Sequence, residues 1–192
     1  MASEVHTDQP PMRADAQRNR ENILKVARAV IAKHGTEASL RSIARGAGVG
    51  LGTLYRHFPT RDALLQQILQ SSFDELTERA GVLASTDSPL DALENWMDEL
   101  AASTSTHQGL AASMVENRQD PTSSLHAACS SLKKSAENLL GSAQQAKVVR
   151  SDIEGADLMS LVAAIAWLSD REALKPEKRK RLLKFVMEGL KE

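Results

Sequence analysis

The sequence is poor in cysteine and in aromatic residues, and it contains no long hydrophobic run. Cys129 is the single cysteine, so the chain cannot form an internal disulfide, which excludes a small secreted scaffold held by disulfide bonds. A membrane helix requires roughly 20 consecutive apolar residues, and no segment approaches this length. The first residues lack the apolar stretch of a secretory signal. We therefore expect a cytoplasmic bacterial protein with no part in the membrane.

Motifs of enzymes and of metal sites are also missing. The glycine-rich segment 46–52 has no strand before it, as a nucleotide-binding loop would require. His126 and Cys129 are three residues apart, but together with His107 they do not have the spacing of a zinc site. No nucleophile elbow is present. The sequence therefore predicts that the chain is not an enzyme and holds no metal or cofactor.

The charges are distributed unevenly, although the formal net charge is only −1. Residues 11–61 carry ten Lys/Arg and three Asp/Glu, a net charge of +7. Residues 62–192 carry fourteen Lys/Arg and twenty Asp/Glu, a net charge of −6. A basic segment on an acidic body is typical of a protein whose one end meets phosphate, and chance clustering is the alternative.

Apolar residues recur at helical spacing throughout, and no alternating strand pattern is found, which predicts an all-α fold of about nine helices. Helix starts are indicated by the capping residues Ser39, Thr60 and Ser88 and by the capping-box spacing of Ser151 and Glu154. The predicted helices span residues 15–34, 39–46, 51–57, 60–80, 88–104, 108–118, 120–146, 154–170 and 176–190.

Segment 39–58 predicts a helix-turn-helix. Its two short helices must cross closely if the second is to lie in the major groove of DNA. Ala44 supplies a small residue at the crossing, and Gly48 allows a sharp turn four residues later. Leu54 then supplies an apolar side chain from the second helix. We interpret residues 1–14 as a disordered arm, 15–60 as the DNA-binding domain and 61–192 as a helical regulatory and dimerisation domain.

Polar residues on the outer face of this segment are the candidates for contact with DNA. Arginine suits guanine edges and phosphate, and threonine suits a thymine methyl group or a phosphate. Tyr55 as a half-buried spacer, His57 as an ordinary surface histidine and Arg41 as a solvated charge are the alternatives. The candidate residues are Ser39, Arg41, Ser42, Gly52, Thr53, Tyr55, Arg56, His57 and Arg61.

Residues 20–65 resemble the N-terminal domain of the TetR/AcrR family of regulators. The resemblance is carried by segments 43–49 (IARGAGV), 52–59 (GTLYRHFP) and 62–65 (DALL). It implies a homodimer, usually a repressor, with a ligand pocket in the C-terminal body. It also implies DNA-contact roles for Ser39, Thr53, Tyr55, His57 and Arg61. Gly50 departs from the usual Ser or Thr, and Arg61 from the usual Lys, which keeps the charge.

The last two predicted helices, 154–170 and 176–190, are apolar enough to pair with a second copy. Two such helices per subunit suit a symmetric four-helix bundle. The resemblance to the TetR/AcrR family implies the same pairing of subunits through these two helices. A purely intramolecular core is the alternative. The basic run 178–181 fits a solvated face better than a second DNA site.

Apolar residues on the middle helices are candidates for a ligand pocket, with an ordinary core as the alternative. The candidates are Trp96, Leu100, Leu110, Met114, Cys129 and Trp167. We predict a repressor released from double-stranded operator DNA by a small apolar or amphipathic ligand. A DNA-binding regulator without such an inducer, or an activator, is the first alternative. A helical small-molecule-binding protein with a vestigial DNA head is the second. The ligand, the operator and the regulated genes stay open.

Overall fold

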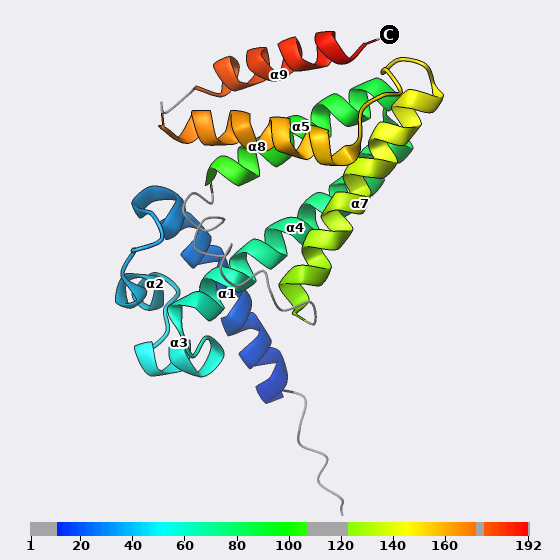
Figure 1. Cartoon of the computed structure of the whole chain (residues 1–192). Coiled ribbons are helices and arrows are strands. Elements are labelled where there is room, and N and C mark those ends of the chain that lie inside the picture. The colour runs from blue at the N-terminus through cyan, green and yellow to red at the C-terminus, as the bar shows by residue number, and fades with distance from the viewer. Residues whose placement is uncertain (1–10, 107–122, 172–174, 192) are drawn as a thin grey trace, which may run out of the picture. The chain divides into compact units, whose positions relative to one another are not determined.

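The computed structural model describes residues 11–106, 123–171 and 175–191, which form helices joined by turns and loops (Figure 1). No strand occurs within these ranges, so the predicted all-α fold is confirmed. The described helices are α1 (Pro11–His34), α2 (Leu40–Gly46), α3 (Leu51–His57), α4 (Arg61–Thr86), α5 (Pro89–Thr106), α7 (Ser124–Gln145), α8 (Gly155–Arg171) and α9 (Pro176–Leu190). None of these is long and apolar enough to cross a membrane.

The chain divides into two compact units, Met1–Ile68 and Leu69–Glu192, whereas the sequence interpretation placed a domain boundary after residue 60. The division falls inside α4, which continues without interruption from Arg61 to Thr86. No proline or left-handed residue breaks the helix there, so its periodicity does not reveal the boundary. We call residues up to 68 the N-terminal unit and the remainder the C-terminal unit.

Several predicted helix limits differ from the structure. Helix α1 begins at Pro11, four residues earlier than predicted, so residues 11–14 are helical rather than part of an arm. A proline is compatible with the first turn of a helix. Helix α7 begins at Ser124 rather than at residue 120, because Ser123 is extended and its hydroxyl accepts a hydrogen bond from the backbone N–H of His126. The predicted helix 108–118 lies outside the described residues.

The N-terminal unit has a small apolar core around α1. Ala27 and Ile31 of α1 lie one helical turn apart and are buried. In Figure 1, α2 runs beside α1 and α3 beside α2, as expected for a three-helix head. Buried side chains from all four helices of this unit close the core. They are Ile23, Leu24, Ala27, Ile31, Ile43, Ala44, Leu54, Leu64, Leu65 and Ile68.

The C-terminal unit has a larger core, which joins α4, α5, α7, α8 and α9. Trp96 of α5 is fully buried, and its indole N–H donates to the backbone oxygen of Leu76 at 2.9 Å. A half-buried ion pair ties α9 to α5, since Arg179 Nε lies 3.0 Å from Asp98 Oδ1. Apolar packing thus holds the five helices of the unit together, and a half-buried ion pair adds a polar contact between α5 and α9.

The helix caps agree with the sequence in two of four cases, and the exception at Ser39 is described with α2 below. Thr60 accepts from the N–H of Ala63, and Ser88 accepts from the N–H of Asp91, as predicted. The predicted capping box beginning at Ser151 is wrong. The Asp157 carboxylate accepts from the N–H of Glu154 instead, so the cap lies three residues later.

Candidate nucleic-acid interface

The turn between α2 and α3 is a Schellman motif centred on Gly48. The N–H of Val49 donates to the oxygen of Ala44, and the N–H of Gly48 donates to the oxygen of Arg45. Gly48 has a φ of +68°, in the left-handed region where a side chain is disfavoured. The predicted role of Gly48 as the turning residue is therefore confirmed.

The crossing of the two short helices is built from the residues that the sequence indicated. Ala44 is 2% exposed and Leu54 is 0% exposed. A Cβ added to Gly46 would lie 2.9 Å from Cγ1 of Val26, so α2 approaches α1 closely at its end. Small residues on α2 and a buried leucine on α3 thereby leave the opposite face of α3 toward solvent.

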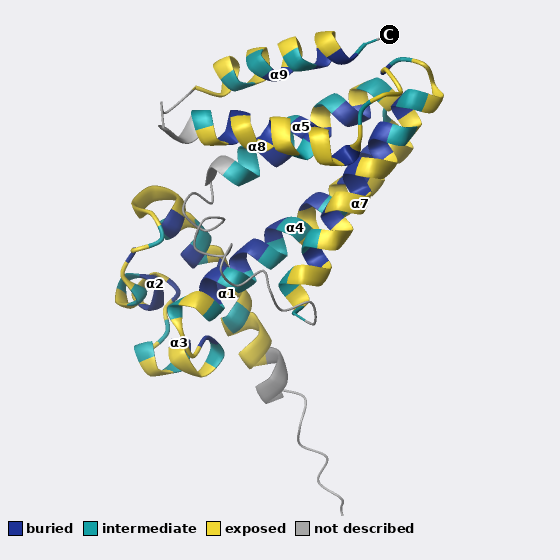
Figure 2. Cartoon of the chain, viewed as in Figure 1, coloured by how far each residue is buried: buried dark blue, intermediate teal, exposed yellow. Residues whose placement is uncertain are grey.

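That outer face of α3 carries the polar candidates (Figure 2). Tyr55 is 45% exposed, Gly52 and Arg56 are exposed, and Thr53 and His57 are half-buried. Arg56 Nη2 lies 3.3 Å from Thr53 Oγ1, so these two side chains share one face of the helix. The geometry presents hydroxyl and guanidinium donors together on a seven-residue helix that can enter a groove.

The candidates of α2 surround its first turn. Ser39 is exposed and stands at the N-cap position, but its side chain makes no capping hydrogen bond, contrary to the predicted side-chain cap. Its carbonyl instead accepts from the N–H of Ile43. Arg41 is exposed and Ser42 is half-buried. The Ser39 hydroxyl and the Arg41 guanidinium are thus available to an anion.

Arg61 differs from the other candidates because it contacts the protein's own backbone. It is half-buried at the start of α4. Its Nη1 donates to the carbonyl oxygens of Thr36 at 2.5 Å and Ala38 at 2.8 Å, both in the loop before α2. The structure therefore gives Arg61 a task inside the head that the sequence did not indicate.

Sequence reasoning missed two further polar residues of α1. Asn22 Nδ2 donates to the backbone oxygen of Ala47 at 2.8 Å, in the turn of the helix-turn-helix. The Arg20 guanidinium lies 5.7 Å from the ring centre of Phe58 and donates to Gln67 Oε1 at 2.6 Å. No motif distinguishes these residues in the sequence, since their partners are distant in the chain.

The ligand-pocket candidates that the structure describes differ in their exposure to solvent. Trp96 and Leu100 are buried in the core, and Cys129 is half-buried on α7. Trp167 is 58% exposed on α8, so it stands at the surface rather than in an enclosed pocket. The reason is that the core side of α8 is occupied by other residues, among them Val162. Leu110 and Met114 lie outside the described residues.

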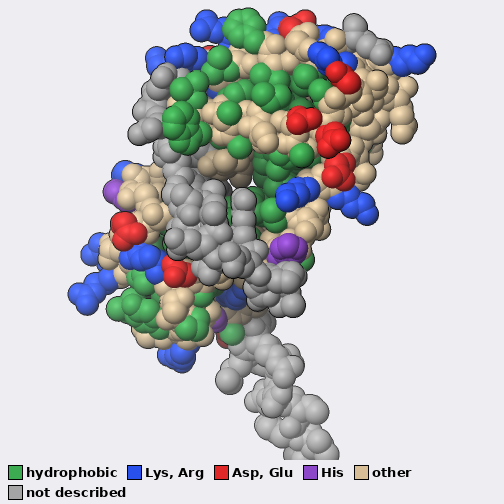
Figure 3. Space-filling view, viewed as in Figure 1, with side chains coloured by type: hydrophobic (Ala, Val, Ile, Leu, Met, Phe, Trp, Pro, Cys, Tyr) green, Lys and Arg blue, Asp and Glu red, His purple; other side chains and the backbone are tan. Residues whose placement is uncertain are grey.

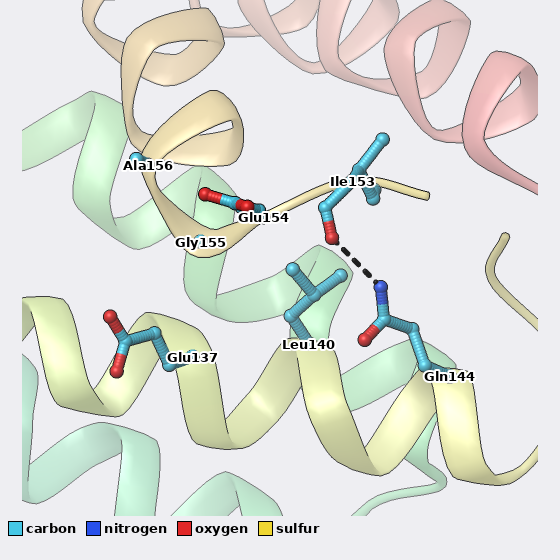
Figure 4. Close-up of a pocket in the computed structure, with 7 residues that line it drawn as sticks. All are labelled: Glu137, Leu140, Gln144, Ile153, Glu154, Gly155 and Ala156. Carbon is cyan, nitrogen blue, oxygen red and sulfur yellow. Dashed lines mark hydrogen bonds between the residues drawn. The ribbon is translucent and has the colours of Figure 1, made fainter. Parts of the chain in front are cut away.

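A surface hollow of about 320 Å³ lies between α7 and the start of α8 (Figure 4). Gln144 crosses it and donates to the oxygen of Ile153 at 3.0 Å. A Cβ on Gly155 would lie 2.8 Å from Cγ of Glu137, so only glycine permits this packing. None of the predicted ligand-pocket residues lines the hollow. Where residues are described, no group of three His, Cys, Asp or Glu could hold a metal ion.

Helices α8 and α9 expose apolar side chains, and Figure 3 shows hydrophobic side chains gathered on the face that carries them. Leu161 is 39% exposed and Trp167 58% exposed on α8, and Phe185 is 65% exposed on α9. Ala163 and Ala164 of α8 are exposed as well. We call these five residues the apolar face of α8 and α9. Exposed aromatic side chains of this size are typical of a surface that contacts another protein.

Two family models cover most of the chain. The model described as "Bacterial regulatory proteins, tetR family" matches residues 23–68. The model described as "Transcriptional regulator SbtR-like, C-terminal domain" matches residues 88–192, which is more than half of the chain. The first match covers the helix-turn-helix and the second covers α5 to α9.

Similar proteins are also regulators described as TetR or HTH-type. A TetR transcriptional regulator from Streptomyces coelicolor is 31% identical, with 90% of this chain and 98% of that chain covered and a TM-score of 0.71. A TetR regulatory protein from Mycobacterium vanbaalenii is 30% identical, with 95% and 100% covered and a TM-score of 0.72. An HTH-type transcriptional regulator of Staphylococcus aureus is 39% identical over 64 residues, which span 33% of this chain and 35% of that relative.

The family is one of DNA-binding transcription factors, which agrees with the predicted absence of enzymatic activity. The outer face of α3, the glycine turn before it and the two matching domains lead to the same assignment. This chain belongs to the TetR family and is a DNA-binding transcriptional regulator.

Proposed function

We propose that this regulator is a homodimeric repressor, which binds operator DNA through α3 and is released by a small apolar or amphipathic ligand. The outer face of α3 is the observation that carries the proposal. Its exposed Tyr55 and Arg56 stand on a helix whose opposite side is fixed in the core by Leu54. A rigid helix with an exposed polar face can enter the major groove without losing its support.

The polar candidates of α2 and α3 divide into two groups with different proposed contacts. Thr53 and Arg56, on one face of α3, suit base edges in the groove. Ser39 and Arg41 at the start of α2, together with Tyr55 and His57, suit the phosphates at the sides of the groove. The net charge of +7 over residues 11–61 attracts the DNA backbone before these contacts form.

Dimerisation through the apolar face of α8 and α9 would place two heads on one duplex. In a single subunit, Trp167 and Phe185 are largely exposed to water, which is unfavourable for side chains of this size. Pairing with the same face of a second copy would bury them in a four-helix bundle. Two heads about 34 Å apart could then contact successive major grooves of a palindromic site.

Ligand control would act through α4, because residues 61–68 of this helix belong to the N-terminal unit and residues 69–86 to the C-terminal unit. A ligand that binds one conformation of the C-terminal unit more tightly shifts the population toward that conformation. The family's C-terminal domain supports this part of the proposal. Thermal-shift screening of metabolites tests it, since an inducer should raise the melting temperature and release DNA. A regulator without an inducer would show neither effect.

DNA recognition can be tested with a duplex that the wild-type protein selects from a random pool. We expect Tyr55→Ala and Arg56→Ala to weaken binding of this duplex by about tenfold or more in fluorescence anisotropy. Arg45→Ala is the matched control, because Arg45 is also an exposed arginine, on α2, but is not among the candidates for contact with DNA. Wild-type affinity in the Tyr55 and Arg56 variants, with the dimer intact, would contradict recognition through α3.

The proposed dimer can be tested by analytical ultracentrifugation. Trp167→Arg places a charge in the apolar face and should convert dimers to monomers at micromolar concentration. Val82→Arg on α4 is the matched control, since Val82 is 43% exposed but lies outside that face. A dimer that survives Trp167→Arg and dissociates on Val82→Arg would locate the interface elsewhere.

A further inference from the structure

Each of the three connections of the helix-turn-helix is held by one side chain from a flanking long helix. Arg61 of α4 holds the loop before α2, Asn22 of α1 holds the turn between α2 and α3, and Arg20 of α1 lies over Phe58 after α3. We infer that these three are positioning residues, which orient α2 and α3 for DNA through contacts within the head. The inference rests on the proposed DNA-binding function and deepens it.

Arg61 donates through Nη1 to two backbone carbonyls, those of Thr36 and Ala38. Hydrogen bonds from a guanidinium are charge-assisted and therefore stronger than those between neutral groups. The two carbonyls belong to the loop that leads to Ser39, where the chain is extended and α2 begins. Arg61 therefore sets the starting direction of α2 in the absence of DNA, whereas a residue used only for phosphate would have no such partners.

Asn22 acts at the other end of α2. Its side-chain amide donates to the oxygen of Ala47, the residue that precedes the left-handed Gly48. The Schellman motif already satisfies the oxygens of Ala44 and Arg45, so Asn22 satisfies a further carbonyl at the same helix end. Ala47 is 6% exposed, and the hydrogen bond fixes the turn against α1.

Arg20 acts at the end of α3. Phe58 is the C-cap residue of α3 and is 2% exposed, and the guanidinium of Arg20 lies over its ring. The contact with Gln67 keeps this guanidinium in place. Both ends of the segment that carries the DNA-contacting residues are therefore attached to α1 or α4 by polar side chains.

The test compares the wild-type-selected duplex with a scrambled duplex of equal length over a range of salt concentrations. We expect Arg61→Gln and Asn22→Ala to weaken binding of the selected duplex about tenfold. Their affinity for the scrambled duplex should stay within about twofold of the wild-type affinity. Their salt dependence should equal that of wild type. Arg41→Ala is the control for a phosphate contact, whose loss should reduce the slope by about 0.9 for each contact.

A reduced salt slope in Arg61→Gln, equal to that of Arg41→Ala, would show that Arg61 is a phosphate contact and would overturn the inference for it. If Asn22→Ala distinguishes the selected from the scrambled duplex as well as wild type does, the inference is overturned for Asn22 and the turn between α2 and α3. If circular dichroism shows that Arg61→Gln does not fold, the inference is tested by Asn22→Ala alone, since this substitution changes no charge. If wild-type protein selects no duplex, the proposed function fails. Hydrogen exchange of residues 39–47 in the free variants then decides whether these side chains hold the connections.

Discussion

Helices α2 and α7 end in the same hydrogen-bonded motif, one in each unit. In α2 the left-handed residue is Gly48, with a φ of +68°. In α7 it is Lys147, with a φ of +56°, and the N–H of Val148 donates to the oxygen of Ala143 as Val49 does in α2. The backbone geometry is shared, but only the N-terminal unit uses the residue that adopts it without strain. The turn that precedes α3 is thus encoded by a local glycine, whereas the same turn after α7 is formed by a lysine at a positive φ.

The two units also differ in what they expose. The N-terminal unit presents hydroxyl and guanidinium groups on α3, around Tyr55 and Arg56. The C-terminal unit presents alanine, leucine and aromatic side chains on α8 and α9, among them Trp167. One surface is suited to an anion and the other to a protein, so the contrast predicts that their variants have separable effects.

The largest effect is expected for Trp96→Ala in the C-terminal unit. The substitution removes a fully buried indole and a hydrogen bond to Leu76, so the free energy of unfolding should fall by about 3–5 kcal/mol. Urea denaturation followed by circular dichroism measures the change. Tyr55→Ala is the surface control and should change stability by less than about 0.5 kcal/mol. Equal losses in both variants would remove the contrast between core and surface.

A smaller loss is expected for Leu54→Ala in the N-terminal unit. Leu54 is 0% exposed and fixes α3 in the head, so its truncation should cost about 3 kcal/mol and weaken DNA binding as well. Leu161→Ala on α8 should leave the stability of the subunit nearly unchanged and affect only its association. Melting curves of both variants, with anisotropy on the selected duplex, separate the two results. Unaltered DNA binding in Leu54→Ala would show that α3 does not depend on this contact.

The paired C-caps provide substitutions with opposite expected signs. Gly48→Ala should lower stability by about 1 kcal/mol, because alanine is strained at a positive φ although no atom lies within 4 Å of the added Cβ. Lys147→Gly should raise stability by about 0.5–1 kcal/mol for the same reason. Chemical denaturation of both variants measures the difference. If both substitutions destabilise, the unfolded-state entropy of glycine outweighs the relief of strain.

The smallest effect concerns the exposed ion pair that follows α7. The hydrogen bond from Arg150 lowers the pKa of Asp152 below its ordinary value of 3.8. A lowered pKa stabilises the folded state above the ordinary value, and this contribution disappears as the pH falls through the folded-state pKa. Arg150→Gln should return the pKa of Asp152 toward 3.8 in an NMR titration. Lys191→Gln, which removes the partner of Glu188, should leave the pKa of Asp152 unchanged.

Much of the N-terminal unit could be predicted because its determinants are close together in the chain. Ala44, Gly48 and Leu54 lie within eleven residues, and their sizes and conformational freedom imply the turn directly. The contacts of Arg61, Asn22 and Arg20 could not be predicted. Each joins residues more than twenty positions apart, and such a pairing exists only once the helices have packed.

In the C-terminal unit, periodicity predicted the helices better than the places of individual side chains. Trp96 and Trp167 both lie on apolar helices, yet one is fully buried and the other is 58% exposed. The capping box of α8 begins at Glu154 rather than Ser151, and Gly155, the first residue of the helix, packs closely on Glu137 of α7, which is distant in the chain.

The amino-acid sequence by itself determined the helical class, the helix-turn-helix and the basic character of the head, since these follow from periodicity, local turn geometry and charge. Only the tertiary structure decided which apolar side chains form the core, which form the exposed face of α8 and α9, and that Arg61 binds backbone carbonyls. The physical reason is that burial and long-range hydrogen bonds depend on how helices pack, and one-dimensional patterns do not specify the partner of each face.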